Sequence, residues 1–204
     1  MFSLSLNSVS KSFGRFRVFE NLNFETEHAI LGIQGANGSG KSTLLRCLAG
    51  LFTPSSGKIE WKISQNAIKQ NDVRTHSGFA APYINLYEEL TIAENLDFLC
   101  KVRGLPFSID ETTQLLKNLG LDRKLTHSYK ALSSGQQQRV KLASAFVVKP
   151  KILFLDEPGT NLDSSGKANL HKVVDDFYKN GSMVVIASND PVELAWCTNT
   201  LSLN

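Results

Sequence analysis

The sequence of 204 residues has few cysteines, no long apolar run and little net charge. Its three cysteines, Cys47, Cys100 and Cys197, are far apart, a pattern that favours reduced thiols over disulfides or a zinc site. No run approaches the ~20 apolar residues that a membrane-spanning helix needs, and we expect no signal peptide because a basic region followed by an apolar stretch is missing. The formal net charge of +3 gives no reason to expect nucleic acid as a partner.

The remaining composition, 42% hydrophobic and 20% charged, is ordinary for a globular protein. Alternating apolar and polar residues over 2–6 predict a half-buried strand, and the apolar run 29–33 is typical of a strand buried on both faces. Pro54 and Gly57 indicate a loop, while apolar residues three or four apart between about 86 and 148 indicate helices. We expect strands over residues 2–6, 29–33, 78–81, 152–155 and 183–187, and helices over residues 44–48, 164–178 and from residue 191.

Residues 35–43 read Gly-Ala-Asn-Gly-Ser-Gly-Lys-Ser-Thr and match the pattern of a phosphate-binding P-loop. Glycines let successive backbone N–H groups approach phosphate oxygens, and the helix that follows adds its N-terminal dipole. In this pattern Lys41 places its ammonium on the β- and γ-phosphates, and the Ser42 hydroxyl ligates magnesium. The alternative is a glycine-rich turn with a chance lysine. The segment nevertheless follows an apolar strand and opens a helix, which is the context that the P-loop requires.

A second nucleotide motif lies where the apolar run 152–155 ends in Asp156 and Glu157. Parallel α/β sheets bind ligands at the carboxyl ends of their strands. An aspartate at that place can hold the water shell of magnesium. Glu157 could polarise a water for attack on the γ-phosphate, as a general base. The alternative is an acidic pair that caps the next helix.

Residues 132–136, Leu-Ser-Ser-Gly-Gln, narrow the class of nucleotide protein. Taken alone, they predict a helix N-terminus with a capping box, because a serine precedes a glutamine by three residues. The segment also resembles the signature sequence of ATP-binding cassette (ABC) ATPases, which in that family stands just ahead of the second nucleotide motif. Both interpretations can hold together, because this helix in the family points its N-terminus at a phosphate.

The resemblance to ABC ATPases runs over essentially the whole chain and implies its fold. The expected class is α/β, with a P-loop NTPase core built on a mostly parallel sheet. An N-terminal antiparallel β subdomain and a helical subdomain at about residues 86–148 would be added to that core. Residues 1–204 would then form a single ABC ATPase domain, most similar to the short cassettes of the heme-exporter-like group.

The resemblance also implies a shared ATP site, in which each ATP lies between the P-loop of one domain and the signature of another. Phe13 stands where the family has an aromatic that stacks on adenine, and Asp163 where a D-loop aspartate bridges the interface. Lys41, Glu157 and Asn189 are the implied catalytic residues, while Ser42 and Asp156 would serve magnesium. The implied ATP contacts are Phe13, Gly35, Asn37, Gly38, Ser39, Gly40, Lys41, Ser42, Thr43, Ser133, Gly135, Gln136 and Asp163.

Three positions depart from the family pattern. Asn189 replaces a switch histidine, and a neutral amide donates a weaker hydrogen bond than a charged group, so we expect turnover slower by about tenfold or less. Pro82 and Tyr83 stand where the family has a glutamine that ligates magnesium, so we expect a water to complete the metal shell. Ser134 replaces the first signature glycine and adds a Cβ near the expected phosphate.

The predicted function is an ATP-binding and hydrolysing subunit that powers an ABC transporter through a separate membrane protein. The expected partners are a second ABC ATPase domain, in a homodimer or a heterodimer, and the integral membrane subunit. They would hold the chain on the cytoplasmic, inner face of the cell membrane. Tyr83, Leu86 and Tyr87 either dock on that subunit or pack internally.

Two other functions remain open at this point. The first is a soluble ABC ATPase that acts on nucleic acid or the ribosome. The single cassette and the lack of sustained heptads between the two nucleotide motifs disfavour it. The second is a degenerate, ATP-sensing cassette with little turnover, which Pro82 and Asn189 would explain.

Overall fold

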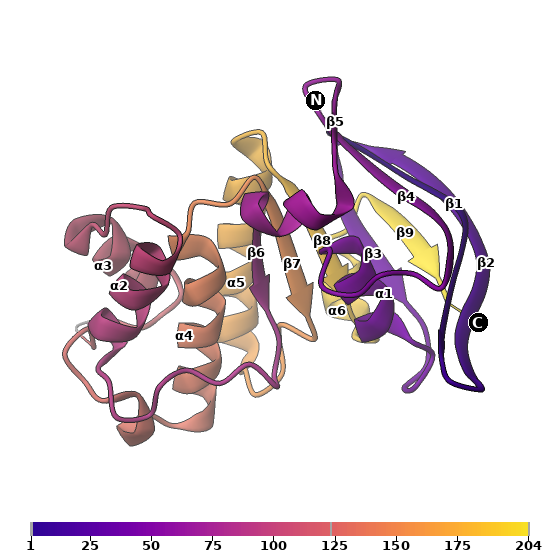
Figure 1. The fold of residues 1–204 in the computed structure, drawn as a ribbon. Coiled ribbons are helices and arrows are strands. Elements are labelled where there is room, and N and C mark those ends of the chain that lie inside the picture. The colour runs from indigo at the N-terminus through magenta and orange to yellow at the C-terminus, as the bar shows by residue number, and fades with distance from the viewer. Residues whose placement is uncertain (1, 123, 204) are drawn as a thin grey trace.

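The computed structural model describes residues 2–122 and 124–203. They form two β-sheets and several helices, and Figure 1 shows the antiparallel sheet at the opposite end of the molecule from the helices α2 (Ile92–Val102) and α3 (Ile109–Asn118). Among the described residues, no helix is long and apolar enough to cross a membrane. The expected α/β class, with a parallel and an antiparallel sheet, is confirmed.

The antiparallel sheet has the strand order β2-β1-β4-β5. The alternation predicted near the N-terminus is confirmed, since Phe2, Leu4 and Leu6 are buried while the serines between them are half-buried. The strand β4 begins inside the segment predicted as a loop, and Trp61 on it is fully buried with its indole N–H donating to the Leu48 carbonyl at 3.0 Å. The strands are β1 (Phe2–Phe13), β2 (Phe16–Glu27), β4 (Ser56–Ile63) and β5 (Asn66–Ile68).

The second sheet has the order β6-β7-β8-β3-β9, and all its neighbouring strands pair in parallel. Side chains of β7 enter two different cores: Leu153 and Leu155 pack among the helices, while Ile152 and Phe154 pack towards α1 and the antiparallel sheet. Burial on both faces explains why these strands read as continuous apolar runs. The strands are β3 (Ile30–Gln34), β6 (Ser77–Ala80), β7 (Ile152–Asp156), β8 (Met183–Ala187) and β9 (Asn199–Ser202).

Three α-helices lie between β6 and β7 in the chain, on the opposite side of β6 from the antiparallel sheet (Figure 1). They are α2 (Ile92–Val102), α3 (Ile109–Asn118) and α4 (Ser134–Val147), with the short 3-10 helix η2 (Tyr129–Ala131) ahead of α4. This is the segment whose spacing predicted helices. The remaining helices are α1 (Lys41–Leu48), η1 (Gln70–His76), α5 (Ser164–Lys179) and α6 (Pro191–Leu194).

Candidate nucleotide-binding site

The P-loop lies between β3 and α1, as its sequence context predicted. Gly40 ends the loop with φ at 98°, in the left-handed region that favours glycine, and directly precedes the first residue of α1. A Cβ at this position would lie 2.6 Å from Cγ1 of Val18, so the space as well as the backbone requires glycine. Gly38 also has a positive φ, 84°. The loop therefore wraps closely ahead of a helix N-terminus, which is a favourable place for a phosphate.

The Lys41 side chain is folded back into this loop. It is 6% exposed, and Nζ donates to the carbonyls of Gly35 at 2.9 Å and Ala36 at 3.1 Å. A Cβ on Gly35 would lie 2.5 Å from the Ser39 hydroxyl oxygen, so both residues form the closed base of the loop. The ammonium group is thus held at the place where phosphate oxygens would replace its carbonyl partners.

Asp156 ends β7 directly beside the P-loop helix. It is 1% exposed, and its Oδ1 accepts a hydrogen bond from the Ser42 hydroxyl at 2.9 Å. Its Oδ2 is buried and has no hydrogen-bond partner within 3.5 Å. Burial raises the pKa of Asp156, while the hydroxyls of Ser42 and Tyr83 lower it. A hydroxyl and a carboxylate with an unsatisfied oxygen are hard oxygen donors, so the two residues fit magnesium.

Glu157 follows with an unusual backbone, since its φ is 45° although it carries a side chain. Such a conformation costs energy and is common at functional sites. The backbone N–H of Glu157 donates to the Ala187 carbonyl at 2.8 Å, and the carboxylate lies 3.8 Å from Lys41 Nζ. Burial raises the pKa of Glu157, and the charge of Lys41 opposes that rise. The arrangement suits a carboxylate that accepts a proton next to the phosphates.

Asn189, in the loop after β8, is joined to the P-loop. Its side-chain Nδ2 donates to Asn37 Oδ1 at 2.8 Å across 152 residues of sequence. A hydrogen bond from the backbone N–H of Asn189 to the Glu157 carboxylate lowers the pKa of that carboxyl. The structure therefore brings Asn189 to the same place as the other two predicted catalytic residues.

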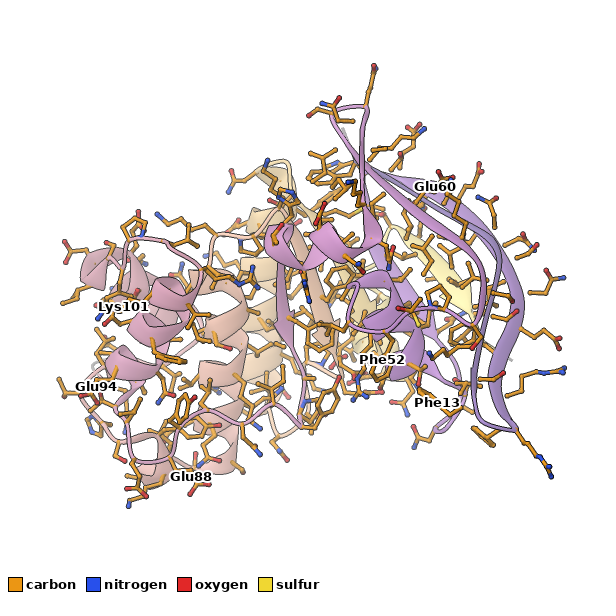
Figure 2. The ribbon with its side chains drawn as sticks, in the orientation of Figure 1. Phe13, Phe52, Glu60, Glu88, Glu94 and Lys101 are labelled. Atoms are coloured by element: carbon orange, nitrogen blue, oxygen red, sulfur yellow. The ribbon has the colours of Figure 1, made fainter. Side chains whose placement is uncertain are left out.

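A cavity of about 360 Å³ lies over these groups and is lined by Phe13, Phe16, Lys41 and Glu157 together with neighbouring P-loop residues. Asn37, Gly38, Gly40, Ser42 and Thr43 are the other sequence-predicted contacts around it. Phe13 is 49% exposed and packs edge-on against Phe52, with ring centres 5.7 Å apart (Figure 2). Exposed aromatic faces beside a phosphate loop can stack on a flat base. Phe16, at 68% exposure, is a lining residue that sequence reasoning missed.

The signature-like segment begins α4 and lies outside the lining of that cavity. The predicted capping box is confirmed: the Gln136 N–H donates to Ser133 Oγ, and the Ser133 N–H donates to the Gln136 side chain. A Cβ on Gly135 would lie 2.8 Å from the Asn161 carbonyl oxygen. Ser134 is exposed, so its added side chain meets no internal obstacle.

Asp163 begins α5 and has partners within its own chain. Its Oδ1 accepts hydrogen bonds from the Gly166 N–H at 2.8 Å and from the Arg139 guanidinium at 3.0 Å. The Gly166 bond is the chief cause that lowers the pKa of Asp163. The side chain of Asp163 therefore caps α5, and it remains 69% exposed to solvent.

Other residues near the site were missed from the sequence. Arg46 on α1 donates from Nε to the Tyr83 hydroxyl at 2.9 Å, next to Asp156. Glu193 on α6 is 2% exposed, and its Oε1 accepts the Gly159 N–H at 2.8 Å. Burial raises the pKa of Glu193. Helix α6 has only four residues, too few for a periodic signal that would have marked Glu193.

Comparison with known families decides the class of protein. The sequence model of the family described as ABC transporter matches residues 19–160, which include the P-loop, the signature-like segment and Asp156. The chain belongs to the ABC transporter family. As an ABC ATPase cassette it binds ATP, and ATP hydrolysis is the reaction of that family.

Relatives of this ABC cassette share about a third of its residues. The sulfate/thiosulfate import ATP-binding protein CysA of Mesostigma viride is 35% identical over 94% of this chain, which spans 56% of that protein. The lipoprotein-releasing system ATP-binding protein LolD of Cytophaga hutchinsonii is 34% identical, over 92% of this chain and 90% of that protein. Both names describe ATP-binding proteins of transport or release systems, one of them an importer.

A solved structure supports the same fold. A dimeric ATP-binding cassette in a post-hydrolysis state, bound to ADP and Pi, aligns with a TM-score of 0.84 and 26% identity. The alignment covers 98% of this ABC chain and 94% of that one. The expected P-loop α/β fold is thereby confirmed.

Proposed function

We propose that this chain is the ATP-hydrolysing subunit of a transporter, acting on a separate membrane protein as one half of a cassette dimer. The observation that carries the proposal is that Lys41, Ser42 and Glu157 line one cavity, with Asp156 buried behind it and bonded to Ser42. These groups come from the P-loop and from the carboxyl end of a parallel strand, where such sheets bind ligands. The ATP-binding relatives support the same function.

In the proposed reaction, Lys41 moves from its carbonyl partners to the β- and γ-phosphate oxygens and neutralises their charge. Glu157 accepts a proton from the water that attacks the γ-phosphorus, while the bond from that phosphorus to the bridging oxygen breaks and ADP leaves. Burial raises the pKa of Glu157, which favours this proton transfer. Ser42 and Asp156 would hold magnesium, which supplies charge stabilisation for the phosphates when it is bound. Phe13 stacks on the adenine ring.

The signature-like segment of the same chain does not line its own cavity, and this supports an ATP site shared between two chains. Ser133, Gly135 and Gln136 would contact the γ-phosphate in the cavity of the second cassette, with the N-terminus of α4 directed at the anion. The exposed oxygen atoms of Asp163 would bridge the two chains at the same interface.

The membrane subunit would dock on the groove that follows β6. This groove has a volume of about 360 Å³, and its lining includes Tyr87, Phe98 and Val102, all of them largely exposed apolar side chains. Leu86 also lines the groove, but it is 9% exposed and packs in the core among the helices. Such a partner would place the chain on the cytoplasmic, inner face of the membrane.

Turnover is proposed to be slow because Asn189 carries no charge. Its amide already reaches Asn37 in the P-loop, so it can donate to a γ-phosphate in the same region. A neutral hydrogen bond is about half as strong as a charge-assisted one. The difference is on the order of 1 kcal/mol, which corresponds to about tenfold or less in rate.

The test is steady-state phosphate release with Mg-ATP for the wild-type chain and the Glu157→Gln variant. Loss of a general base is expected to slow release by ~10²–10⁴-fold. Glu88→Gln is the matched control, because Glu88 is exposed on the helical side of the molecule, away from Phe13 (Figure 2). Equal rates for wild type and Glu157→Gln would contradict the proposed role of Glu157.

A further inference from the structure

The turn after β6 is built next to the end of β7. Ala80 pairs with Leu155 in the parallel register, so the chain that leaves β6 runs alongside Asp156. The Ile84 N–H donates to the Ala81 carbonyl at 3.1 Å, which closes a turn with Pro82 and Tyr83 at its centre. Lys141 on α4 donates to the Pro82 carbonyl at 2.6 Å. The turn is therefore held by its own backbone hydrogen bond and by the hydrogen bond from Lys141 on α4.

The Tyr83 side chain is held from a third element, α1. Arg46 donates from Nε to the phenol oxygen at 2.9 Å, and its guanidinium carbon lies 4.2 Å from the centre of the Tyr83 ring. The same guanidinium lies 5.3 Å from the Phe52 ring. Because Arg46 can only donate, the phenol accepts from it and keeps its own proton for another acceptor.

The acceptor that needs this proton is the Asp156 carboxylate. Its Oδ1 already accepts from Ser42, while Oδ2 is buried without a hydrogen-bond partner within 3.5 Å. A buried carboxylate oxygen without a donor is costly. Ser42 and Arg46 lie one turn apart on α1, so their partners Asp156 and Tyr83 meet the same face of that helix. Oδ2 of Asp156 accepts no hydrogen bond from Tyr83 in this structure, but the Tyr83 hydroxyl contributes to lowering the pKa of Asp156, after the larger effects of burial and Ser42. Burial chiefly raises the pKa of the Tyr83 phenol, and Asp156 adds to that rise.

We propose that Tyr83 is a positioning residue for Asp156: its hydroxyl, oriented by Arg46, donates to the Asp156 carboxylate and fixes how that group faces the magnesium ion. The inference rests on the proposed function, because it takes Asp156 as part of the magnesium site. It leaves in place the expectation that a water completes the metal shell, because Tyr83 acts on Asp156 and is not itself a metal ligand. Partners that orient metal-binding groups typically affect metal affinity by ~10–100-fold.

The test measures metal binding without turnover, by electron paramagnetic resonance titration of Mn²⁺ into the full chain with β,γ-imido-ATP. The variant is Tyr83→Phe, which removes one hydroxyl and keeps the ring that stacks on Arg46. Tyr178→Phe is the matched control, because Tyr178 lies at the C-terminal end of α5, outside the proposed sites, and its ring stacks on His28. Arg46→Lys is a second variant, which keeps the charge and loses the Nε donor.

We expect Tyr83→Phe to weaken nucleotide-dependent Mn²⁺ binding by about tenfold or more, Arg46→Lys to weaken it less, and Tyr178→Phe to leave it unchanged. Binding of a fluorescent ATP analogue in EDTA, and the melting temperature, should be the same in all chains. The inference would be overturned if Tyr83→Phe bound Mn²⁺ as tightly as wild type, or if it lost nucleotide affinity in EDTA as much as it lost Mn²⁺ affinity. Neither outcome would contradict the proposed function. Failure of the wild-type chain to bind Mn²⁺ with nucleotide would remove the proposed function as well.

Discussion

Single side chains set the chemistry of the site through partners that are remote in sequence. Asn37 and Asn189 meet across 152 residues, and Ser42 meets Asp156 across 114. The motifs predicted that Lys41, Ser42, Asp156 and Glu157 would gather, because each stands beside a recognisable strand or helix boundary. They could not predict the Asn37–Asn189 bond, since an amide pair in two loops leaves no periodic or spacing signal.

A residue-scale prediction concerns Asn189. Replacing it with histidine is expected to raise the turnover number by up to about tenfold, because a protonated imidazole can donate a charge-assisted hydrogen bond to the γ-phosphate. The measurement is steady-state phosphate release at saturating Mg-ATP. Asn180→His, at the exposed C-terminal end of α5, is the control for a histidine elsewhere. An unchanged rate in Asn189→His would mean that the amide does not limit turnover.

Individual elements differ in how far their sequence predicts them. The strands β3, β7 and β8 are buried on both faces, so their apolar runs are visible without knowledge of the fold. Strand β9 has four residues and only Leu201 buried among them, so no pattern predicted it. The position of Tyr83 could not be predicted from the sequence either. Its neighbours belong to α1 and β7, and only the sheet register brings these elements together.

An element-scale prediction concerns the contact of α4 with the loop after β7. Gly135→Ala gains helix propensity of up to ~1 kcal/mol, but its Cβ would lie 2.8 Å from the Asn161 carbonyl oxygen. Overpacking of this kind typically costs ~1–3 kcal/mol, so we expect a net fall of about 1 kcal/mol in the free energy of unfolding. Urea titration without nucleotide measures it.

The control for Gly135→Ala is Ser134→Ala, one residue earlier and exposed. It should change the free energy of unfolding by no more than ~0.5 kcal/mol, as is usual for surface positions. If Gly135→Ala instead raised the free energy of unfolding, the loop that carries Asn161 would have to move away from the new Cβ without loss of stability. The close approach would then not be the reason for glycine at this position.

At the scale of the whole molecule, the two proposed half-sites lie in separate places. The cavity beside the P-loop has no lining residue from α4, and Ser133 and Ser134 at the start of α4 are exposed. A ligand with phosphate acceptors on two sides can join such half-sites from two chains, and its hydrolysis removes the bond that joins them. The modest net charge of +3 opposes association of two copies only weakly.

The prediction at this scale is ATP-dependent dimerisation of Glu157→Gln chains, in which bound ATP persists because turnover is slowed. Gel filtration should show a dimer with Mg-ATP and a monomer with ADP. Ser133→Arg should abolish the dimer yet keep ATP binding, because Ser133 lies outside the cavity. Ser108→Arg, which removes the equivalent side-chain cap of α3, controls for the lost cap. If Glu157→Gln chains bind ATP and stay monomeric, this cassette pairs with a different one, because its own signature does not complete its own site.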